Sequence, residues 1–299
     1  PARAGLGGGD VFGQQVVSGL SAGCLYALAA LGLVLIYRTM DIVNFAHGEM
    51  AMVSTFMAHT LLVRLGLSYI PAALGAIIFA FIFGMAVERI FLRPIQGGPL
   101  ISLMIMTLGL FMVFNGAAGW VWGFDPVSFP RAVSGRPIWL GDLIITRDSI
   151  LVLAVTIAMA LALYVVLRFT MAGIAIRATS QNSRAARLMG VPVPKVYALT
   201  WGISAVLGAV AGILIAPTTF LSPSMMAEVQ IKAFTAAVLG GFSSLPGAVV
   251  GGLLLGVLEN LVAGYISTEL KSTFAFALIV VVLFIRPSGL LGTPPKRKV

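Results

Sequence analysis

Charged residues are scarce in this sequence. Asp, Glu, Lys and Arg make up only 10% of its 299 residues, while hydrophobic residues make up 59%. Soluble domains carry about 25% charged residues. A water-soluble fold of this composition would have to expose large apolar patches, which soluble monomers rarely do. The low charge therefore excludes a soluble globular protein and predicts an integral membrane protein.

Cysteine and histidine are nearly absent, and the common catalytic and metal-binding motifs are missing as well. The single cysteine, Cys24, cannot form an intrachain disulfide, so the sequence does not indicate a redox compartment. The two histidines, His47 and His59, belong to no HExxH motif, and the sequence also lacks a GxSxG motif and the GxxxxGK[ST] motif of a P-loop. We therefore predict no catalytic residue, no metal site and no cofactor in this chain. It is not expected to be an enzyme. If it transports a solute against a gradient, the energy would come from another chain or from an ion.

Acidic residues are about half as common as basic ones. There are 10 Asp and Glu against 19 Lys and Arg, which gives a formal net charge of +9. A strongly basic chain can bind nucleic acid, but here the basic residues are scattered at the ends of apolar runs. At such places Lys and Arg fix the orientation of membrane spans and contact lipid head groups. The charge therefore indicates membrane topology and lipid contact, and no nucleic acid partner.

Long apolar runs are the dominant feature that is present. A transmembrane helix needs about 20 mostly apolar residues. The sequence predicts an all-α integral membrane protein, a polytopic helix bundle of about eight long spans plus one short or broken membrane helix. The long spans are expected at 14–37, 43–63, 69–92, 100–120, 149–168, 196–216, 246–264 and 272–286, and the short piece at 230–241.

Basic residues assign the sides of the membrane. Loops rich in Lys and Arg stay in the cytoplasm, which places the loop at Arg89 and Arg93, the segment 168–195 and the C-terminal end inside. The loop 121–148 balances its charges and carries tryptophans typical of an outer interface. We therefore expect an extracytoplasmic lead at 1–13, a single transmembrane domain at 14–292 with a cytoplasmic loop at 169–195, and a basic cytoplasmic tail at 293–299.

Counting crossings from these anchors requires one more passage of the membrane. The N-terminus lies outside, so the segment Ala227–Gly241 has to cross as a short helix for the last span to end inside. The following glycine-rich stretch, Gly240–Gly247, then has two interpretations. It is either a broken helix beside a transport pathway or a tight cytoplasmic turn between two ordinary helices.

A short helix is predicted inside the basic segment, at Ser183–Met189. Ser180 or Asn182 can cap its first turn through a side-chain oxygen, and Gly190 followed by Pro192 ends it. Helical spacing puts Arg184 and Arg187 on one face, and Ala185, Ala186 and Met189 on the other. Such a helix can either enter a groove on a partner protein or lie on anionic lipid at the membrane surface.

Several polar residues within the spans are candidates for a translocation path. Ionisable residues in spans usually face the bundle or a water-filled passage. Asn44, His47 and Glu49 stand at the cytoplasmic entrance of the second span, and they either form a gate or hold the start of that helix by hydrogen bonds. A second set of polar residues either contacts the substrate or forms helix–helix hydrogen bonds. That set is Thr107, Asn115 and Glu259.

Glycines also recur at four-residue spacing, for example at Gly19 and Gly23 and at Gly252 and Gly256. Small residues at this spacing let membrane helices approach closely. We expect these positions to serve helix packing.

Four motifs together resemble the high-affinity, LivH-type family of branched-chain amino acid permeases. Residues 44–49, Asn-Phe-Ala-His-Gly-Glu, are similar to a signature of that family, and residues 238–241, 245–252 and 284–292 are similar to others. Residues 184–190, Arg-Ala-Ala-Arg-Leu-Met-Gly, resemble the Glu-Ala-Ala-x-x-x-Gly loop of ABC-importer permeases, with Arg in place of Glu. The likeness extends from about Gln14 to Gly292.

The resemblance implies a permease subunit of an ATP-driven importer in the bacterial inner membrane, for branched-chain or related amino acids. Its expected partners are a second permease subunit, by analogy a paralogue, two cytoplasmic ATP-binding subunits, an extracytoplasmic solute-binding protein, the amino-acid substrate and membrane lipid. The helix near 183–190 would couple the chain to the ATPases. The coupling residues are Arg177, Asn182, Arg184, Ala185, Ala186, Arg187, Met189 and Gly190.

Gly240 and Gly241 join the expected path or gate because they begin the glycine-rich break. The alternative function is an ion-coupled secondary transporter or channel that acts without an ATPase. It would need titratable groups near the bilayer centre, whereas the ionisable residues of this sequence cluster near the ends of spans.

Overall fold

The computed structural model describes residues 8–292 except 134 and 142. The predicted tail at 293–299 and residues 1–7 of the predicted lead therefore lie outside the described residues. The chain forms two compact units. Unit 1 comprises the residues up to Ala30, Arg131–Ile157 and the residues from Ile231 on, and unit 2 comprises Leu31–Pro130 and Ala158–Gln230. Each unit is described separately below.

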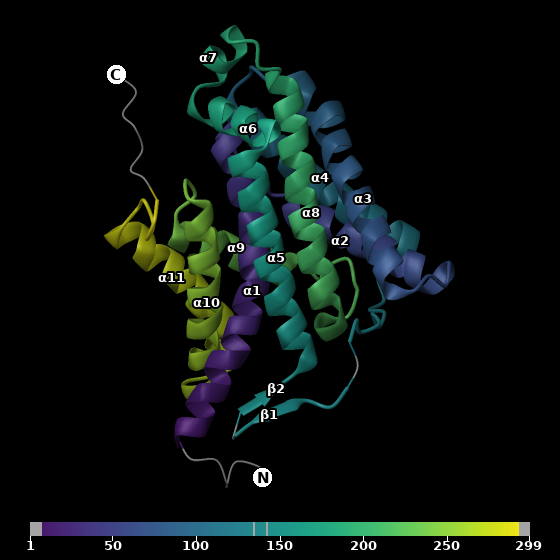
Figure 1. Cartoon of the computed structure of the whole chain (residues 1–299), viewed down its shortest axis with the longest axis vertical. Coiled ribbons are helices and arrows are strands. Elements are labelled where there is room, and N and C mark those ends of the chain that lie inside the picture. Colours follow the sequence, from purple (N-terminus) through teal and green to yellow (C-terminus); the bar gives the residue numbers. More distant parts are fainter. Residues whose placement is uncertain (1–7, 134, 142, 293–299) are drawn as a thin grey trace. The chain divides into compact units, whose positions relative to one another are not determined.

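The chain is built almost entirely of helices (Figure 1). Its long helices are α1 (Gly8–Met40), α3 (Tyr69–Val87), α4 (Leu100–Trp122), α5 (Arg147–Phe169), α8 (Val193–Thr219) and α10 (Leu245–Tyr265). Its shorter helices are α2 (His47–His59), α6 (Met171–Gln181), α7 (Ser183–Leu188), α9 (Ala227–Gly240) and α11 (Leu270–Ile285). A π-helical turn, η1 (Thr60–Arg64), extends α2, while a second π-helical turn, η2 (Glu88–Leu92), and a 3-10 turn, η3 (Arg93–Ile95), extend α3.

Every predicted long span corresponds to a helix. Among the described residues, six helices are long and apolar enough to cross a membrane. The other two predicted long spans coincide with α2 plus η1 and with the 16-residue α11. The prediction of an all-α membrane fold is therefore confirmed, whereas the count of about eight long spans is not.

The loop predicted to lie outside contains a β-hairpin that the sequence analysis missed. Its strands β1 (Ile138–Leu140) and β2 (Leu143–Ile145) pair antiparallel. The side chain of Gln14, in the first turns of α1, donates to the Ile144 carbonyl at 3.0 Å and accepts from the Ile144 amide at 2.9 Å. The side-chain amide of Gln14 therefore satisfies both backbone groups of Ile144 and fastens the hairpin to α1 within unit 1.

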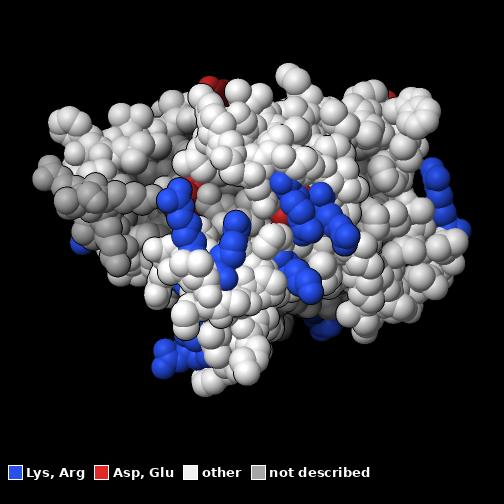
Figure 2. Space-filling view, turned by 90° about the horizontal axis from the view of Figure 1, so that it is seen from above, with Lys and Arg blue, Asp and Glu red and all other residues white. Residues whose placement is uncertain are grey.

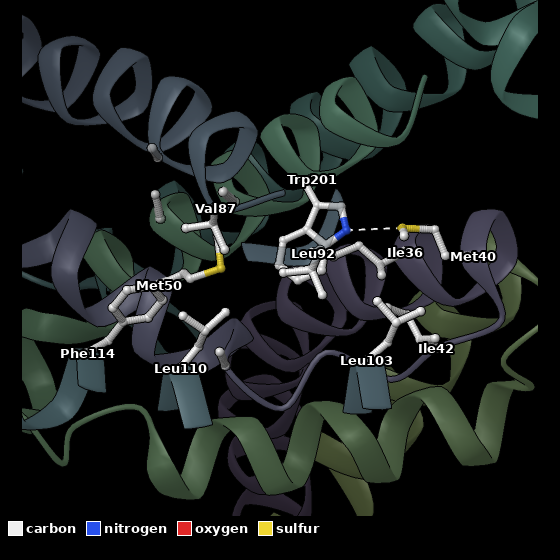
Figure 3. Close-up of a cluster of buried hydrophobic side chains, with 14 residues drawn as sticks. Ile36, Met40, Ile42, Met50, Val87, Leu92, Leu103, Leu110, Phe114 and Trp201 are labelled. Atoms are coloured by element: carbon white, nitrogen blue, oxygen red, sulfur yellow. Dashed lines mark hydrogen bonds between the residues drawn. The ribbon is translucent and has the colours of Figure 1, made fainter. Parts of the chain in front are cut away.

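The core of unit 2 lies where α3 and α8 pack together. Gly84 leaves no room for a side chain beside the Trp201 carbonyl, and Gly202 lies against Phe81 and Met85. Trp201 is fully buried, and its indole nitrogen donates to the Met40 sulfur at 3.2 Å (Figure 3). The surrounding buried cluster draws on α1, α2, α4 and the turn after α3. This core includes Ala46 and Met50 and so fixes the start of α2, where several of the candidate path residues lie.

Close glycine packing joins α1 to α10 within unit 1, as the four-residue spacing predicted. A Cβ atom on Gly252 would stand 2.6 Å from the Ala27 amide nitrogen, and one on Gly23 would stand 2.8 Å from the Gly252 carbonyl oxygen. Both contacts are to backbone, which cannot move aside as a flexible side chain can.

Replacing Gly252 with alanine is therefore expected to destabilise the protein by about 1–3 kcal/mol, the usual cost of overpacking. The matched control is Gly116→Ala in α4, where an added Cβ meets nothing within 4 Å. This control should be neutral or stabilise by up to about 1 kcal/mol through helix propensity. Thermal unfolding of the purified variants in one detergent measures the difference. Equal melting temperatures for the two variants would contradict the close packing.

Candidate functional site

The short helix α7 forms as the sequence predicted. The Asn182 side-chain oxygen accepts hydrogen bonds from the amides of Arg184 at 3.1 Å and Ala185 at 3.0 Å, and so caps the first turn. Gly190 ends the helix with a φ of +86°, a left-handed conformation that glycine adopts without steric cost. The predicted cap at Asn182 and the predicted stop at Gly190 are both confirmed.

The exposed face of α7 differs from the predicted one. Ala186 is buried against its own chain, whereas Ala185 and Met189, which were predicted to share its face, are exposed. It is Leu188 that accompanies Met189, and these two side chains are 89% and 84% exposed. A short helix held at one end by a cap and at the other by a glycine thus presents two bare apolar side chains, and Arg184 and Arg187 are exposed beside them.

The sequence analysis did not predict α6, which precedes α7 in the basic segment. Thr170 caps α6 by accepting from the Gly173 amide at 3.1 Å, and Gly173 lies against the backbone of Leu167 at the end of α5. The Arg177 side chain folds back to the Arg168 carbonyl at 3.5 Å. The signal that could have revealed this helix is Thr170, a good N-cap residue, directly before an amphipathic stretch. Because α6 is anchored to α5, it gives α7 a fixed base.

Basic side chains gather at this end of unit 2. Figure 2 views the molecule from the side on which α6 and α7 lie in Figure 1 and shows many Lys and Arg side chains but few acidic ones. The exposed basic residues of α7 and its flanks include Arg168, Arg184, Arg187 and Lys195. The surface is therefore basic with a small apolar projection, a combination suited to a partner that offers an acidic rim around an apolar groove.

A polar junction in unit 2 brings together predicted path residues from α2 and α4. The Asn115 side chain donates to the Glu49 carboxylate at 3.3 Å and to the Pro223 carbonyl at 3.0 Å. The Thr107 hydroxyl, two turns earlier on the same face of α4, accepts from the Phe45 amide at 3.3 Å. Thr107 and Asn115 of the second predicted set therefore meet the start of α2, where the first set lies, whereas Glu259 belongs to unit 1.

Asn44 and His47 complete this junction and are buried. The Asn44 side-chain oxygen accepts from the Ala46 amide at 3.0 Å, and its carbonyl accepts from the Gln230 side chain at 3.4 Å. The His47 ring lies within 3.3 Å of the Ser204 hydroxyl and fills the space beside Gly32, where a Cβ would collide with it. The start of α2 is thus held by hydrogen bonds to neighbouring helices, as the structural interpretation of these residues predicted.

Asn115→Asp is expected to disrupt the junction, because it would remove the donor that faces the buried Glu49 and place a second carboxyl group beside it. Leaving a buried acceptor unsatisfied costs about 1–3 kcal/mol, and a like charge adds to this. The double variant Asn115→Asp with Glu49→Gln restores a donor–acceptor pair in reverse and should recover the part of the stability and uptake that depends on this pair, while the hydrogen bond to the Pro223 carbonyl stays lost. Thermal unfolding and substrate uptake measure both effects. Recovery would not occur if the two side chains did not interact.

Gly240 and Gly241, in unit 1, form a tight turn between α9 and α10. A side chain on Gly240 would collide with the Gly247 carbonyl, and Gly241 has a φ of +98°. The C-terminal segment covers this turn, since the amides of Leu290 and Leu291 donate to the last carbonyls of α9 at 2.8 and 3.0 Å. The structure therefore favours the interpretation as a turn and gives the two glycines a packing role.

Glu259 forms an ion pair that the sequence analysis missed. Its carboxylate lies 2.5 Å from Lys232 Nζ on α9 and 3.9 Å from Lys271 Nζ on α11. The side chains of Glu259 and Lys232 are 0% and 5% exposed, and the lysine also lies over the Tyr26 ring at 5.3 Å. The carboxylate is therefore engaged by lysines of its own chain and is not open to an ammonium group from a substrate in this arrangement.

Among the described residues, the six long apolar helices define an integral membrane protein. Within the described residues no group of three or more His, Cys, Asp or Glu side chains is arranged to hold a metal ion. A family model described as "Branched-chain amino acid transport system / permease component" matches residues 15–283. The chain belongs to this family of permease components. It is a multi-pass protein of the cytoplasmic membrane and a transport subunit rather than an enzyme.

Individual relatives are similar over nearly their whole length. The high-affinity branched-chain amino acid transport system permease protein LivH of Salmonella typhimurium is 34% identical, with 96% of this chain and 98% of that protein covered. The corresponding protein BraD of Pseudomonas aeruginosa is 35% identical, with 96% and 97% covered. A solved structure, PsaBC from Streptococcus pneumoniae in complex with Fab, contains a chain that is similar in fold. That chain has a TM-score of 0.50, 15% sequence identity and 92% coverage of both chains.

Proposed function

We propose that this chain is the permease subunit of an ATP-driven importer of branched-chain or related amino acids. The chain would form half of the translocation path, and a second permease, a paralogue of this one, would form the other half. Two cytoplasmic ATP-binding subunits and an extracytoplasmic solute-binding protein would complete the transporter. The family membership and the full-length likeness to LivH and BraD support the importer and its substrate class.

The exposed apolar tip of α7 is the observation that carries the proposal of ATPase docking. Leu188 and Met189 are nearly fully exposed on a capped helix in a basic surface. Bare apolar side chains of this kind mark contact sites for partners. Arg184 and Arg187 would orient the docking, because ion pairs at an exposed rim contribute only about 0–1 kcal/mol each.

The proposed topology has about eight long spans, with α9 as an additional short membrane helix. At 1.5 Å per residue, the 14 residues of α9 are only about 21 Å long, short of a hydrocarbon core of about 30 Å. The domain at 14–292 would also carry one cytoplasmic coupling loop, at 169–195. For the path, the supported candidates are Asn44, His47, Glu49, Thr107 and Asn115, which the structure joins within unit 2.

Two variants test docking through α7. Replacing Gly190 with tryptophan strains the left-handed turn, and changing Arg184 and Arg187 to glutamate reverses the charge of the docking surface. Each is expected to reduce ATP-dependent uptake at least about tenfold. A loss of about 1.4 kcal/mol in the free energy of docking lowers the affinity for the ATPase subunits by a factor of ten. Uptake into proteoliposomes and retention of the ATPase subunits during purification provide the measurement. Normal uptake by both variants would refute the docking role.

A further inference from the structure

An apolar groove opens on the surface of unit 2 between α3, α5 and α8. Its volume is about 220 Å³, larger than the cavity of about 150 Å³ that admits a benzene molecule. Four of its lining residues follow one another at helical spacing on a single face of α5, and α3 and α8 supply the opposite wall. The principal lining residues are Phe81, Met159, Ala162, Leu163, Val166 and Val206.

Cations stand at the end of this groove that the basic residues assign to the cytoplasm. The Arg93 guanidinium donates to the Pro194 carbonyl at 3.1 Å, which brings the end of the α3 segment beside the start of α8. Glu88 is satisfied by Arg93 and by Gln96, at 3.0 and 2.7 Å. Glu88 thus has its own partners in Arg93 and Gln96. The exposed Arg89 and Lys195 are available to an external anion.

Lys195 lies on a face of α8 that borders the groove, and Arg89 lies in the turn that follows α3. Lys195 precedes Val206 by 11 residues, which is close to three helical turns, so both lie on the same side of α8. Arg89 is one turn before Arg93, whose guanidinium reaches the Pro194 carbonyl, so it lies near the start of α8. The length of α8 from Lys195 to Val206 is about 16 Å, similar to the half-thickness of a hydrocarbon core, about 15 Å. The spacing matches a lipid whose head group lies at Lys195 and whose acyl chain follows α8 into the bilayer.

We infer that this groove binds an anionic phospholipid of the cytoplasmic leaflet. The phosphate of the head group contacts Arg89 and Lys195, and one acyl chain occupies the space between Phe81, Ala162 and Val206. Basic pockets between membrane helices on the cytoplasmic side bind anionic lipid head groups in this way. The apolar lining fits an acyl chain and offers no partner to a polar solute.

Lipid retention by the purified full-length chain tests the site. The chain is reconstituted in nanodiscs of dioleoyl-phosphatidylglycerol or dioleoyl-phosphatidylcholine, extracted with detergent, and analysed by native mass spectrometry for bound lipid. The wild-type chain is expected to retain phosphatidylglycerol preferentially. Arg89→Gln with Lys195→Gln should weaken this binding about 25-fold, since each cation near an anionic head group contributes a factor of about five. Ala162→Trp, which fills the groove, should abolish retention of this lipid.

Matched controls separate the site from general membrane contact. Arg64→Gln removes an exposed arginine at the end of η1, and Ala117→Trp adds an indole to an exposed position of α4. Both should retain the lipid as the wild type does. Ala162→Leu repeats the groove test with a smaller side chain should the tryptophan variant not fold.

Three results would overturn the inference. The first is equal retention of the two lipids by the wild-type chain. The second is an unchanged preference in the double charge variant. The third is unchanged lipid retention in a folded Ala162 variant. If that variant also failed to pair with a second permease, the groove would be assigned to a helix of that partner.

Discussion

Glu259→Gln is expected to destabilise this protein by about 3–5 kcal/mol, because it leaves Lys232 buried without its carboxylate partner. The glutamine keeps the size of the glutamate, so the effect reports the charge and not a cavity. The Lys232 side chain is only 5% exposed and contacts Tyr26, and this leaves it little access to water. Low yield of monodisperse protein and a lower melting temperature in detergent are the expected observations.

Restoring charge balance should restore stability. Lys232→Met combined with Glu259→Leu replaces the ion pair by apolar groups of similar volume, a change that is often neutral or stabilising. Lys271 is 32% exposed and can turn its ammonium group outward once the carboxylate is gone. The control is Glu269→Gln, since Glu269 is an exposed acid near the start of α11. A melting temperature of Glu259→Gln equal to that of this control would show that the pair is not essential to unit 1.

Leu188→Asp with Met189→Asp is expected to release the ATPase subunits while leaving the permease folded. Apolar anchors at the centre of a protein interface each contribute at least about 2 kcal/mol, or roughly 30-fold in affinity. Aspartate at either position would place a charge in the groove that the anchor fills. Both side chains are nearly fully exposed in the chain alone, so the substitutions should not lower its melting temperature.

Purification of the complex through a tag on the permease measures this loss directly, and uptake should fall in parallel. Leu65→Asp is the matched control, because Leu65 is also an exposed leucine, at 64%, but precedes α3 at the end remote from Pro194. Full retention of the ATPases by the double variant would mean that the apolar tip of α7 is not the docking element. Loss of the ATPases by the control as well would point to a general effect of added charge.

Local chemistry explains why much of this structure could be predicted from the sequence. A membrane span is encoded by the apolarity of about 20 consecutive residues, and the expected spans accordingly coincide with helices. The helix α7 was predictable for the same reason. Its cap at Asn182 and its stop at Gly190 depend on residues within one or two turns.

The missed elements depend on contacts that the local pattern does not contain. The hairpin of β1 and β2 is short and is held by Gln14, 130 residues away from Ile144. The burial of Ala186 depends on what the rest of unit 2 places beneath α7, and the helical wheel alone could not separate it from Ala185.

The sequence by itself determined that this chain is a helical membrane protein of the permease family, with a capped helix in its longest basic segment. Only the tertiary structure decided which polar side chains meet. Asn115 and Glu49 are 66 residues apart, and His47 and Ser204 are 157 residues apart. Lys232 and Glu259 lie on different helices. In a low-dielectric bilayer each buried polar group requires a partner, and packing of the helices selects that partner from positions far apart in the chain.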